Sequence, residues 1–134
     1  MKTTTQSPSA FFAPQLTLKN VSAGVEFYKK ALGATVLRQW DNPDGSIHVA
    51  EMEISGAMFH LHEEVPRTNQ LSAETAGTST CLIGIFVDDP HAIVKSAEEA
   101  GAKVINPVQD YDYGYRQGTF VDPFGHQWMI EKRI

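Results

Sequence analysis

The sequence lacks most of the features that mark special classes of protein. One cysteine, Cys81, among 134 residues excludes an internal disulfide framework and favours a cytoplasmic setting. Lys and Arg number 11 against 16 Asp and Glu, and the formal net charge of −5 disfavours nucleic acid and anionic membranes as partners. No apolar run approaches the length that crosses a bilayer. We therefore expect one ordinary globular domain with a substantial core.

Two segments show little periodicity. Residues 1–9 are polar and lack the apolar core of a signal peptide, so they predict a flexible tail ahead of a domain over residues 10–134. Residues 65–80 contain Pro66 and Gly77 and predict a connector within that domain. Directly after it, Cys81 begins an apolar run, which favours a buried and inert thiol.

The first part of the domain, residues 10–64, alternates strand and helix signals. Apolar residues alternate along 11–18 and predict a strand. Asn20 can then cap a helix that Gly33 ends. Further strands are expected at 34–40, 47–54 and 58–63, and turn signals separate them. The predicted order is β-α-β-β-β.

The last part, residues 81–134, repeats this order. A strand over 81–87 precedes a helix that begins at Asp88-Asp89-Pro90 and ends before Gly101. The turn Asp122-Pro123-Phe124-Gly125 joins two strands in a closing hairpin. The remaining expected segments are a strand at 103–108, a tyrosine-rich loop at 110–114, and strands at 115–121 and 127–131.

Short matches in register support a duplicated unit. Ala31–Leu37 matches Glu99–Ile105, and each segment combines a helix end, a Gly-Ala pair and a strand. Gly56–Leu61 likewise matches Gly125–Ile130. Two copies of one supersecondary unit are the economical explanation.

Three features of the sequence belong together: the paired βαβββ units, Phe27-Tyr28 ahead of Leu32-Gly33-Ala34, and the terminal Asp122-Pro123-Phe124-Gly125-His126. In combination they resemble the vicinal oxygen chelate superfamily. That group contains glyoxalase I, extradiol dioxygenases, fosfomycin-resistance enzymes and bleomycin-resistance proteins. The resemblance covers residues 10–133. It implies an α+β fold of two βαβββ modules that form a cup-shaped pair of half-barrels, and often a homodimer with its cavities near the subunit contacts. It does not by itself name an activity.

The resemblance also implies a divalent metal that acts as a Lewis acid, with ligands on the first and last strands of each module. Counted from Phe27-Tyr28, the four ligand positions fall on Ala13, His60, Leu82 and Met129. Of these side chains only His60 suits such a metal, so we expect no family-type metal site and no cofactor. The alternative is a divalent metal held by His60 with His62, or with Glu51 or Glu53 from the neighbouring strand.

Strand alternation and aromatic content identify a candidate ligand cavity. Alternation directs Met58, His60 and His62 into the cup, and Gln127, Met129 and Glu131 from the last strand. Three alternating tyrosines and a tryptophan suit a flat organic ligand, and an arginine beside them can pair with an anionic group. Alternatively, these rings pack a dimer contact or cover a sheet. The predicted cavity residues are His60, His62, Trp40, Tyr111, Tyr113, Tyr115, Arg116 and Met129.

Three functions are compatible with these residues. We expect a protein that holds a small organic molecule in the cup without a metal, as bleomycin-resistance members do. The alternative is an enzyme, either metal-free or a metal-dependent lyase, isomerase or dioxygenase with a non-standard ligand set around His60. The third is a regulatory or structural dimer, which requires that bulky side chains fill the cup, namely Met58, Leu82, Phe86 and Met129. The spacing identifies no catalytic residue.

Overall fold

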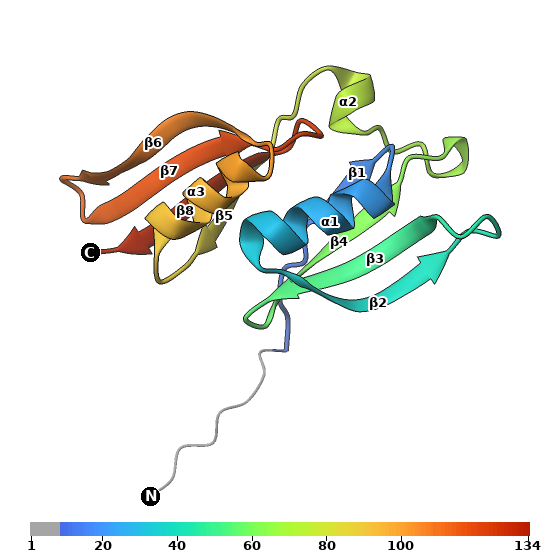
Figure 1. Cartoon of the computed structure of the whole chain (residues 1–134), viewed down its shortest axis with the longest axis horizontal. Coiled ribbons are helices and arrows are strands. Elements are labelled where there is room, and N and C mark those ends of the chain that lie inside the picture. Colours follow the sequence, from blue (N-terminus) through green and yellow to red (C-terminus); the bar gives the residue numbers. More distant parts are fainter. Residues whose placement is uncertain (1–8) are drawn as a thin grey trace, which may run out of the picture.

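The computed structural model describes residues 9–134, so the predicted tail lies outside the described residues except for Ser9. Two modules of the same βαβββ order follow one another along the chain (Figure 1). Their four-stranded sheets have the orders β1-β4-β3-β2 and β5-β8-β7-β6 and remain open. The predicted α+β fold of two βαβββ modules is confirmed.

The elements lie close to the predicted ranges. The first module contains β1 (Gln15–Leu18), α1 (Val21–Leu32), β2 (Thr35–Asp41), β3 (Ile47–Ile54) and β4 (Ala57–Glu63). The second contains β5 (Leu82–Phe86), α3 (Pro90–Glu99), β6 (Lys103–Tyr111), β7 (Tyr115–Val121) and β8 (Gln127–Arg133). Between them lie a 3-10 turn, η1 (Pro66–Thr68), and a short helix, α2 (Ala73–Ala76). No helix within residues 9–134 is long and apolar enough to span a membrane.

Local chemistry sets the helix ends. The side chain of Asn20 accepts a hydrogen bond from the backbone N–H of Ala23 at 3.0 Å, and Gly33 ends α1 in the left-handed conformation with a φ of 67°. Asp89 caps α3 in the same way, through the N–H of Ala92 at 3.2 Å. The predicted caps of α1 at Asn20 and Gly33 are confirmed.

Each helix covers one face of its own sheet. Leu16 and Leu61 on neighbouring strands β1 and β4 are buried beneath α1. Ile130 on β8 is buried in the corresponding place beneath α3. The two helices contact each other where the modules meet (Figure 1), so both helix-covered faces belong to one core. Aromatic rings from both modules meet there: Tyr28 lies 5.6 Å from Trp128 and Phe59 lies 5.7 Å from Trp128, between ring centroids.

The closing hairpin is anchored by a buried carboxylate. Asp122 is 3% exposed, and one carboxylate oxygen accepts hydrogen bonds from the Tyr28 hydroxyl and from Nε1 of Trp128. The other oxygen accepts from the backbone N–H groups of Phe124 and His126, at 2.9 and 3.0 Å. Burial raises the pKa of Tyr28 well above its usual value, and the charge and hydrogen bond of Asp122 add to this effect. The Asp-Pro-Phe-Gly turn thus connects module 2 to α1 of module 1.

Three local predictions were wrong. The first strand begins at Gln15, where the pairing of β1 with β4 starts, and Phe12 is 98% exposed. The tyrosine-rich loop is shorter than predicted, since β6 extends to Tyr111 through pairing with Tyr115. Cys81 is exposed, because it precedes edge strand β5 and no neighbouring strand covers it.

The connector is held to the first module by hydrogen bonds. The carboxylate of Glu64 accepts from the N–H and hydroxyl of Ser72, at 3.0 and 3.1 Å, and from the hydroxyl of Thr75 at 2.7 Å. Ser72 is fully buried and caps α2. These bonds, chiefly that from Thr75, lower the pKa of Glu64.

Candidate functional site

The face of each sheet that is turned away from its helix is called its open face. In module 1 the strand register aligns two rows of side chains across this face. One row consists of Arg38, Glu51, His60 and Gln15, and the next of Trp40, Val49, His62 and Thr17. The predicted cavity residues Trp40, His60 and His62 therefore lie on one face.

His60 and His62 form a stacked pair of imidazoles. Their ring centroids are 5.7 Å apart and the ring planes differ by 8°. The Nε2 atom of each ring is buried and has no hydrogen-bond partner among residues 9–134. Desolvation lowers the pKa of His62, and the positive charges of His60 and His48 lower it further. His62 is therefore a neutral imidazole at neutral pH.

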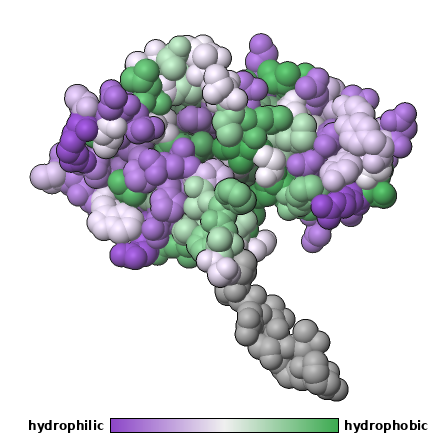
Figure 2. Space-filling view, turned by 180° about the vertical axis from the view of Figure 1, so that it is seen from behind, coloured by the Kyte–Doolittle hydropathy of each residue, from purple (hydrophilic) through white to green (hydrophobic). Residues whose placement is uncertain are grey.

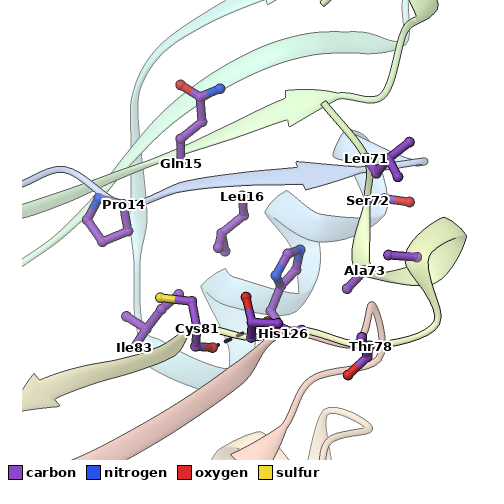
Figure 3. Close-up of a pocket in the computed structure, with 13 residues that line it drawn as sticks. Pro14, Gln15, Leu16, Leu71, Ser72, Ala73, Thr78, Cys81, Ile83 and His126 are labelled. Atoms are coloured by element: carbon purple, nitrogen blue, oxygen red, sulfur yellow. Dashed lines mark hydrogen bonds between the residues drawn. The ribbon is translucent and has the colours of Figure 1, made fainter. Parts of the chain in front are cut away.

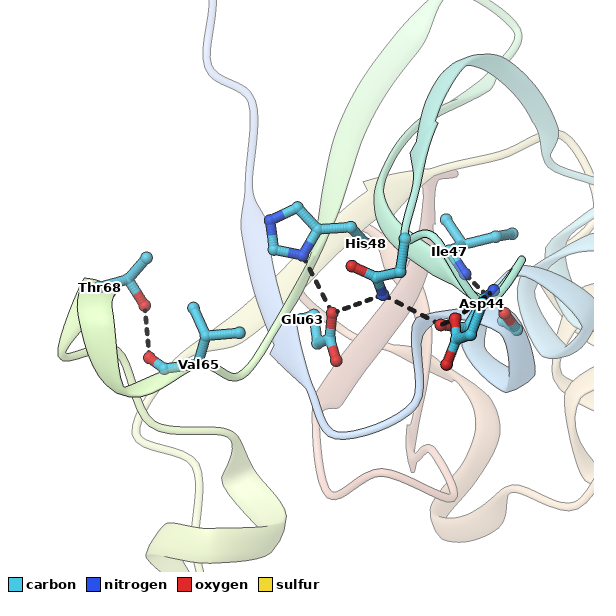
Figure 4. Close-up of polar contacts among 9 residues, drawn as sticks. Asp44, Ile47, His48, Glu63, Val65 and Thr68 are labelled. Carbon is cyan, nitrogen blue, oxygen red and sulfur yellow. Dashed lines mark hydrogen bonds and ion pairs between the residues drawn. The ribbon is translucent and has the colours of Figure 1, made fainter.

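A third histidine, His48, lies at the end of the same sheet in a separate polar cluster (Figure 4). Its Nδ1 lies 3.0 Å from Oε1 of Glu63, which also accepts a hydrogen bond from the Asn42 amide at 3.0 Å. These contacts, first that of His48, lower the pKa of Glu63. They connect the β2–β3 turn to the end of β4, which is a structural role.

The residues at the implied metal positions do not fit a divalent ion. Parallel pairing places Gln15 opposite His60, and Gly84 opposite Met129. The implied positions Ala13 and Leu82 lie two residues before these partners, and neither side chain can bind an ion. Gly84 offers no ligand, and the thioether of Met129 is a soft one. Within residues 9–134 no three His, Cys, Asp or Glu side chains are grouped to hold an ion.

The open face of module 2 holds an aromatic cluster of four rings: Tyr111, Tyr113, Tyr115 and Phe86. Tyr111 and Tyr113 stack with ring centroids 5.3 Å apart and planes within 18°. Tyr113 lies 5.8 Å from Tyr115, which lies 6.0 Å from Phe86. The structure thus brings the three predicted tyrosines together and adds Phe86, which the sequence indicated only as a side chain that could fill the cup.

Arg116 lies on the other face of this sheet. It alternates with Tyr115 along β7, and its guanidinium donates to both carboxylate oxygens of Asp110, at 2.6 and 3.2 Å. That hydrogen bond raises the pKa of Arg116, and the charge of Asp89 at the start of α3 adds to it. Arg116 is therefore turned toward α3 and away from the aromatic cluster.

A chain of hydrogen bonds extends from the aromatic cluster into the sheet. The Tyr113 hydroxyl donates to Oε1 of Gln117 at 2.5 Å, and Nε2 of Gln117 donates to Oε1 of Glu131 at 2.9 Å. Glu131 is only 8% exposed. The alternation of β8 already directed Glu131 to this face, but its partner depends on the β7–β8 register and could not be identified from the sequence.

Of the four side chains that would fill the cup, Met58 and Met129 are half-buried and the other two are exposed. Leu82 is 48% exposed and Phe86 is 52% exposed. Figure 2 shows the molecule from the side opposite to Figure 1, with apolar residues gathered near the middle and polar residues toward both ends. The open faces are thus not closed by the chain's own side chains.

A pocket of about 280 Å³ lies between β1, the connector and the start of β5 (Figure 3). His126 lines it, and its Nε2 donates to the backbone carbonyl of Thr17 at 3.1 Å. Cys81 and Leu71 also line it. This pocket could not be predicted from the sequence, because it forms only where β1, α2 and β5 meet. Its lining includes none of the aromatic cluster.

Comparison with known proteins identifies the family. The model of the Glyoxalase/Bleomycin resistance protein/Dioxygenase superfamily matches residues 11–130. The chain belongs to this superfamily, and the predicted resemblance is confirmed. An uncharacterised protein of Mycobacterium bovis is 31% identical over 125 residues, which are 91% of this chain and 82% of that protein. An uncharacterised protein of Mycobacterium tuberculosis is also 31% identical, over 91% of this chain and 74% of that protein.

Solved structures show the same fold at lower identity. TioX from Micromonospora sp. ML1 superposes with a TM-score of 0.75 at 22% identity, covering 94% of this chain and all of that one. A glyoxalase/bleomycin resistance protein/dioxygenase family enzyme from Burkholderia phytofirmans PsJN has a TM-score of 0.69 at 17% identity, covering 90% and 95% of the two chains. These similarities establish the fold and not an activity.

Proposed function

We propose that the protein binds a small organic molecule on the open face of module 2 and needs no metal to do so. The aromatic cluster is the observation that carries this proposal. Tyr113 remains 59% exposed and Phe86 52% exposed, although large rings are usually buried. Exposed rings with a few polar groups between them suit a flat ligand, because rigid side chains lose little entropy on binding.

We further propose that the protein acts as a cytoplasmic homodimer. A single chain leaves both open faces accessible and leaves the apolar residues Phe12, Leu82 and Phe86 about half or fully exposed. A second copy that covers these side chains would enclose the ligand and convert an open face into a cavity. Light scattering on the eluting protein tests this proposal. If the measured molar mass equals that of one chain at every protein concentration tested, the dimer proposal is contradicted.

Ligand screening tests the binding proposal. Planar aromatic compounds should raise the melting temperature of the wild type in proportion to their concentration. Tyr113→Ala and Tyr115→Ala should each weaken binding about tenfold or more, since each removes a stacking ring. Ile105→Ala is the control, because Ile105 is a 52% exposed apolar residue on the same sheet and lies outside the cluster. Equal losses in all three variants would contradict the proposed site.

The stacked histidines support a second function, a metal-dependent lyase, isomerase or dioxygenase with a non-standard ligand set. The Nε2 atoms of His60 and His62 have no hydrogen-bond partner in the part of the chain that the structure describes, and Glu51 is directly opposite His60 on β3. Elemental analysis before and after addition of Zn, Ni, Mn and Fe separates the two functions. Near-stoichiometric metal that is lost in His60→Ala would favour the enzyme. Absence of metal under all these conditions would favour the binding protein.

A further inference from the structure

The open face of module 2 contains a nearly enclosed carboxylate that the aromatic cluster alone does not explain. Glu131 is 8% exposed, and it lies on β8 between Met129 and Arg133, which point to the same face. A buried carboxylate is costly unless hydrogen bonds or a positive charge compensate it. The surroundings of Glu131 therefore indicate what it binds.

One oxygen of this carboxylate is held by the protein. Gln117 donates from Nε2 to Oε1 of Glu131, and the Tyr113 hydroxyl fixes the orientation of the Gln117 amide by donating to its oxygen. Desolvation raises the pKa of Tyr113, and the nearby Tyr111, Asp112 and Glu131 raise it further. The hydroxyl thus remains protonated at neutral pH and remains a donor. The side chain of Glu131 is oriented before any ligand arrives.

The other oxygen, Oε2, accepts no hydrogen bond from residues 9–134. It lies above Gly84 on the neighbouring strand β5, where a Cβ atom would come within 2.7 Å of it. Any side chain at position 84 would displace the carboxylate. Glycine here leaves Oε2 on the open face, and Phe86, two residues further along β5, is the register partner of Glu131.

Arg133, on the same face, forms no hydrogen bond or ion pair with Glu131 among the described residues. The hydrogen bond to Tyr115 raises the pKa of Arg133, and the charges of Tyr115 and Glu131 raise it further. The Arg133 guanidinium lies over the Phe86 ring, 5.0 Å from its centroid, and its Nε points to the Tyr115 hydroxyl at 3.4 Å. This contact shows that the rings of this face accept a cation. The free carboxylate oxygen and the ring faces thus form two adjacent features that both attract positive charge.

We infer that this face selects aromatic ligands that carry a protonated amine or amidine, with the cationic nitrogen on Oε2 of Glu131 and the ring on the tyrosines. The inference rests on the proposed function, because it names the class of ligand for the same face. A net charge of −5 favours the approach of such cations over long range. A hydrogen bond from a cationic N–H group to a buried carboxylate is charge-assisted, and it is therefore stronger than a hydrogen bond between neutral groups.

Three acridines of different charge test the inference on the intact protein by fluorescence titration. At neutral pH 9-aminoacridine is a cation, acridine is neutral and acridine-9-carboxylate is an anion, while the ring system is unchanged. We expect 9-aminoacridine to bind at least about tenfold more tightly than acridine, and acridine-9-carboxylate to bind most weakly of the three. Glu131→Gln keeps the shape of the side chain and should remove the preference for the cation while leaving acridine binding unchanged.

Two further variants control for folding effects. Gly84→Ala keeps the glutamate at position 131 but pushes its carboxylate aside. This variant should therefore also weaken the binding of 9-aminoacridine more than that of acridine. Glu26→Gln removes an equal charge from the exposed surface of α1 and should change nothing. If all three acridines bind alike, the charge preference is wrong and the proposed binding face stands. If none binds, both proposals are contradicted.

Discussion

The two modules have the same fold but different chemistry on their open faces. Toward the helices, equivalent strand positions are alike: Leu61 in module 1 corresponds to Ile130 in module 2, and Phe59 corresponds to Trp128. Toward the open faces they diverge, since Gln15, Thr17, His60 and His62 correspond to Gly84, Phe86, Met129 and Glu131. The core requires apolar volume on one side of each sheet. The other side could therefore diverge without loss of the fold.

The hairpins that precede β4 and β8 differ in the same way. The turn between β3 and β4 consists of Ser55 and Gly56, both with positive φ, and it is short. Its counterpart between β7 and β8 is longer and contains Asp122, which binds Tyr28 of the other module. Only the second hairpin therefore contributes a polar anchor between modules.

Removal of that anchor should have the largest effect. Asp122→Ala leaves the buried Tyr28 hydroxyl and the Nε1 of Trp128 without an acceptor, so the free energy of unfolding should fall by about 3 kcal/mol or more. Chemical denaturation followed by tryptophan fluorescence measures the loss. Asp44→Ala is the matched control, since Asp44 also lies in a turn but bonds only Ser46 at the surface and should cost less than about 1 kcal/mol. Equal losses would contradict the anchoring role.

The two helices also differ in the size of the residue at their fourth position. The fourth residue of α1 is Gly24 and that of α3 is Ile93. A Cβ at Gly24 would overlap Cδ1 of the buried Leu18. Gly24→Ala should therefore lower the free energy of unfolding by about 1–2 kcal/mol, because overpacking outweighs the gain in helix propensity. Lys30→Ala, at an exposed position of the same helix, should be neutral or slightly stabilising. An increase in stability for Gly24→Ala would show that α1 can move away from its sheet.

The smallest expected effect is the pH dependence of the histidine pair. The pKa of His62 in the folded protein is lowered, so protons bind the unfolded chain more tightly. The contribution of His62 to stability is complete above the unfolded pKa of about 6.5 and declines as the pH falls toward the folded value. Melting temperatures between about pH 7.5 and 5.5 should fall less in His62→Gln than in the wild type. The exposed His91→Gln is the control, and an unchanged pH dependence in His62→Gln would contradict the argument.

Local signals allowed much of the fold to be predicted. The caps at Asn20 and Gly33 and the Asp122 turn depend on nearby residues, so the sequence is sufficient to place them. The candidate site was predicted less well. Arg116 was grouped with the tyrosines although it pairs with Asp110 and faces α3. Strand register depends on long-range pairing, and a small error there changes which side chains meet.

The sequence by itself determined the duplicated βαβββ order, the family, and the apolar sides of the strands, because periodicity and turn chemistry are local properties. Only the tertiary structure determined that Gln117 and Tyr113 hold Glu131, that Gly84 leaves one of its oxygens free, and that Asp122 connects the modules. The partners in these contacts come from different strands, and from different modules in the case of Asp122 and Tyr28. Such distances are set by sheet register and helix packing, which no short segment of sequence contains.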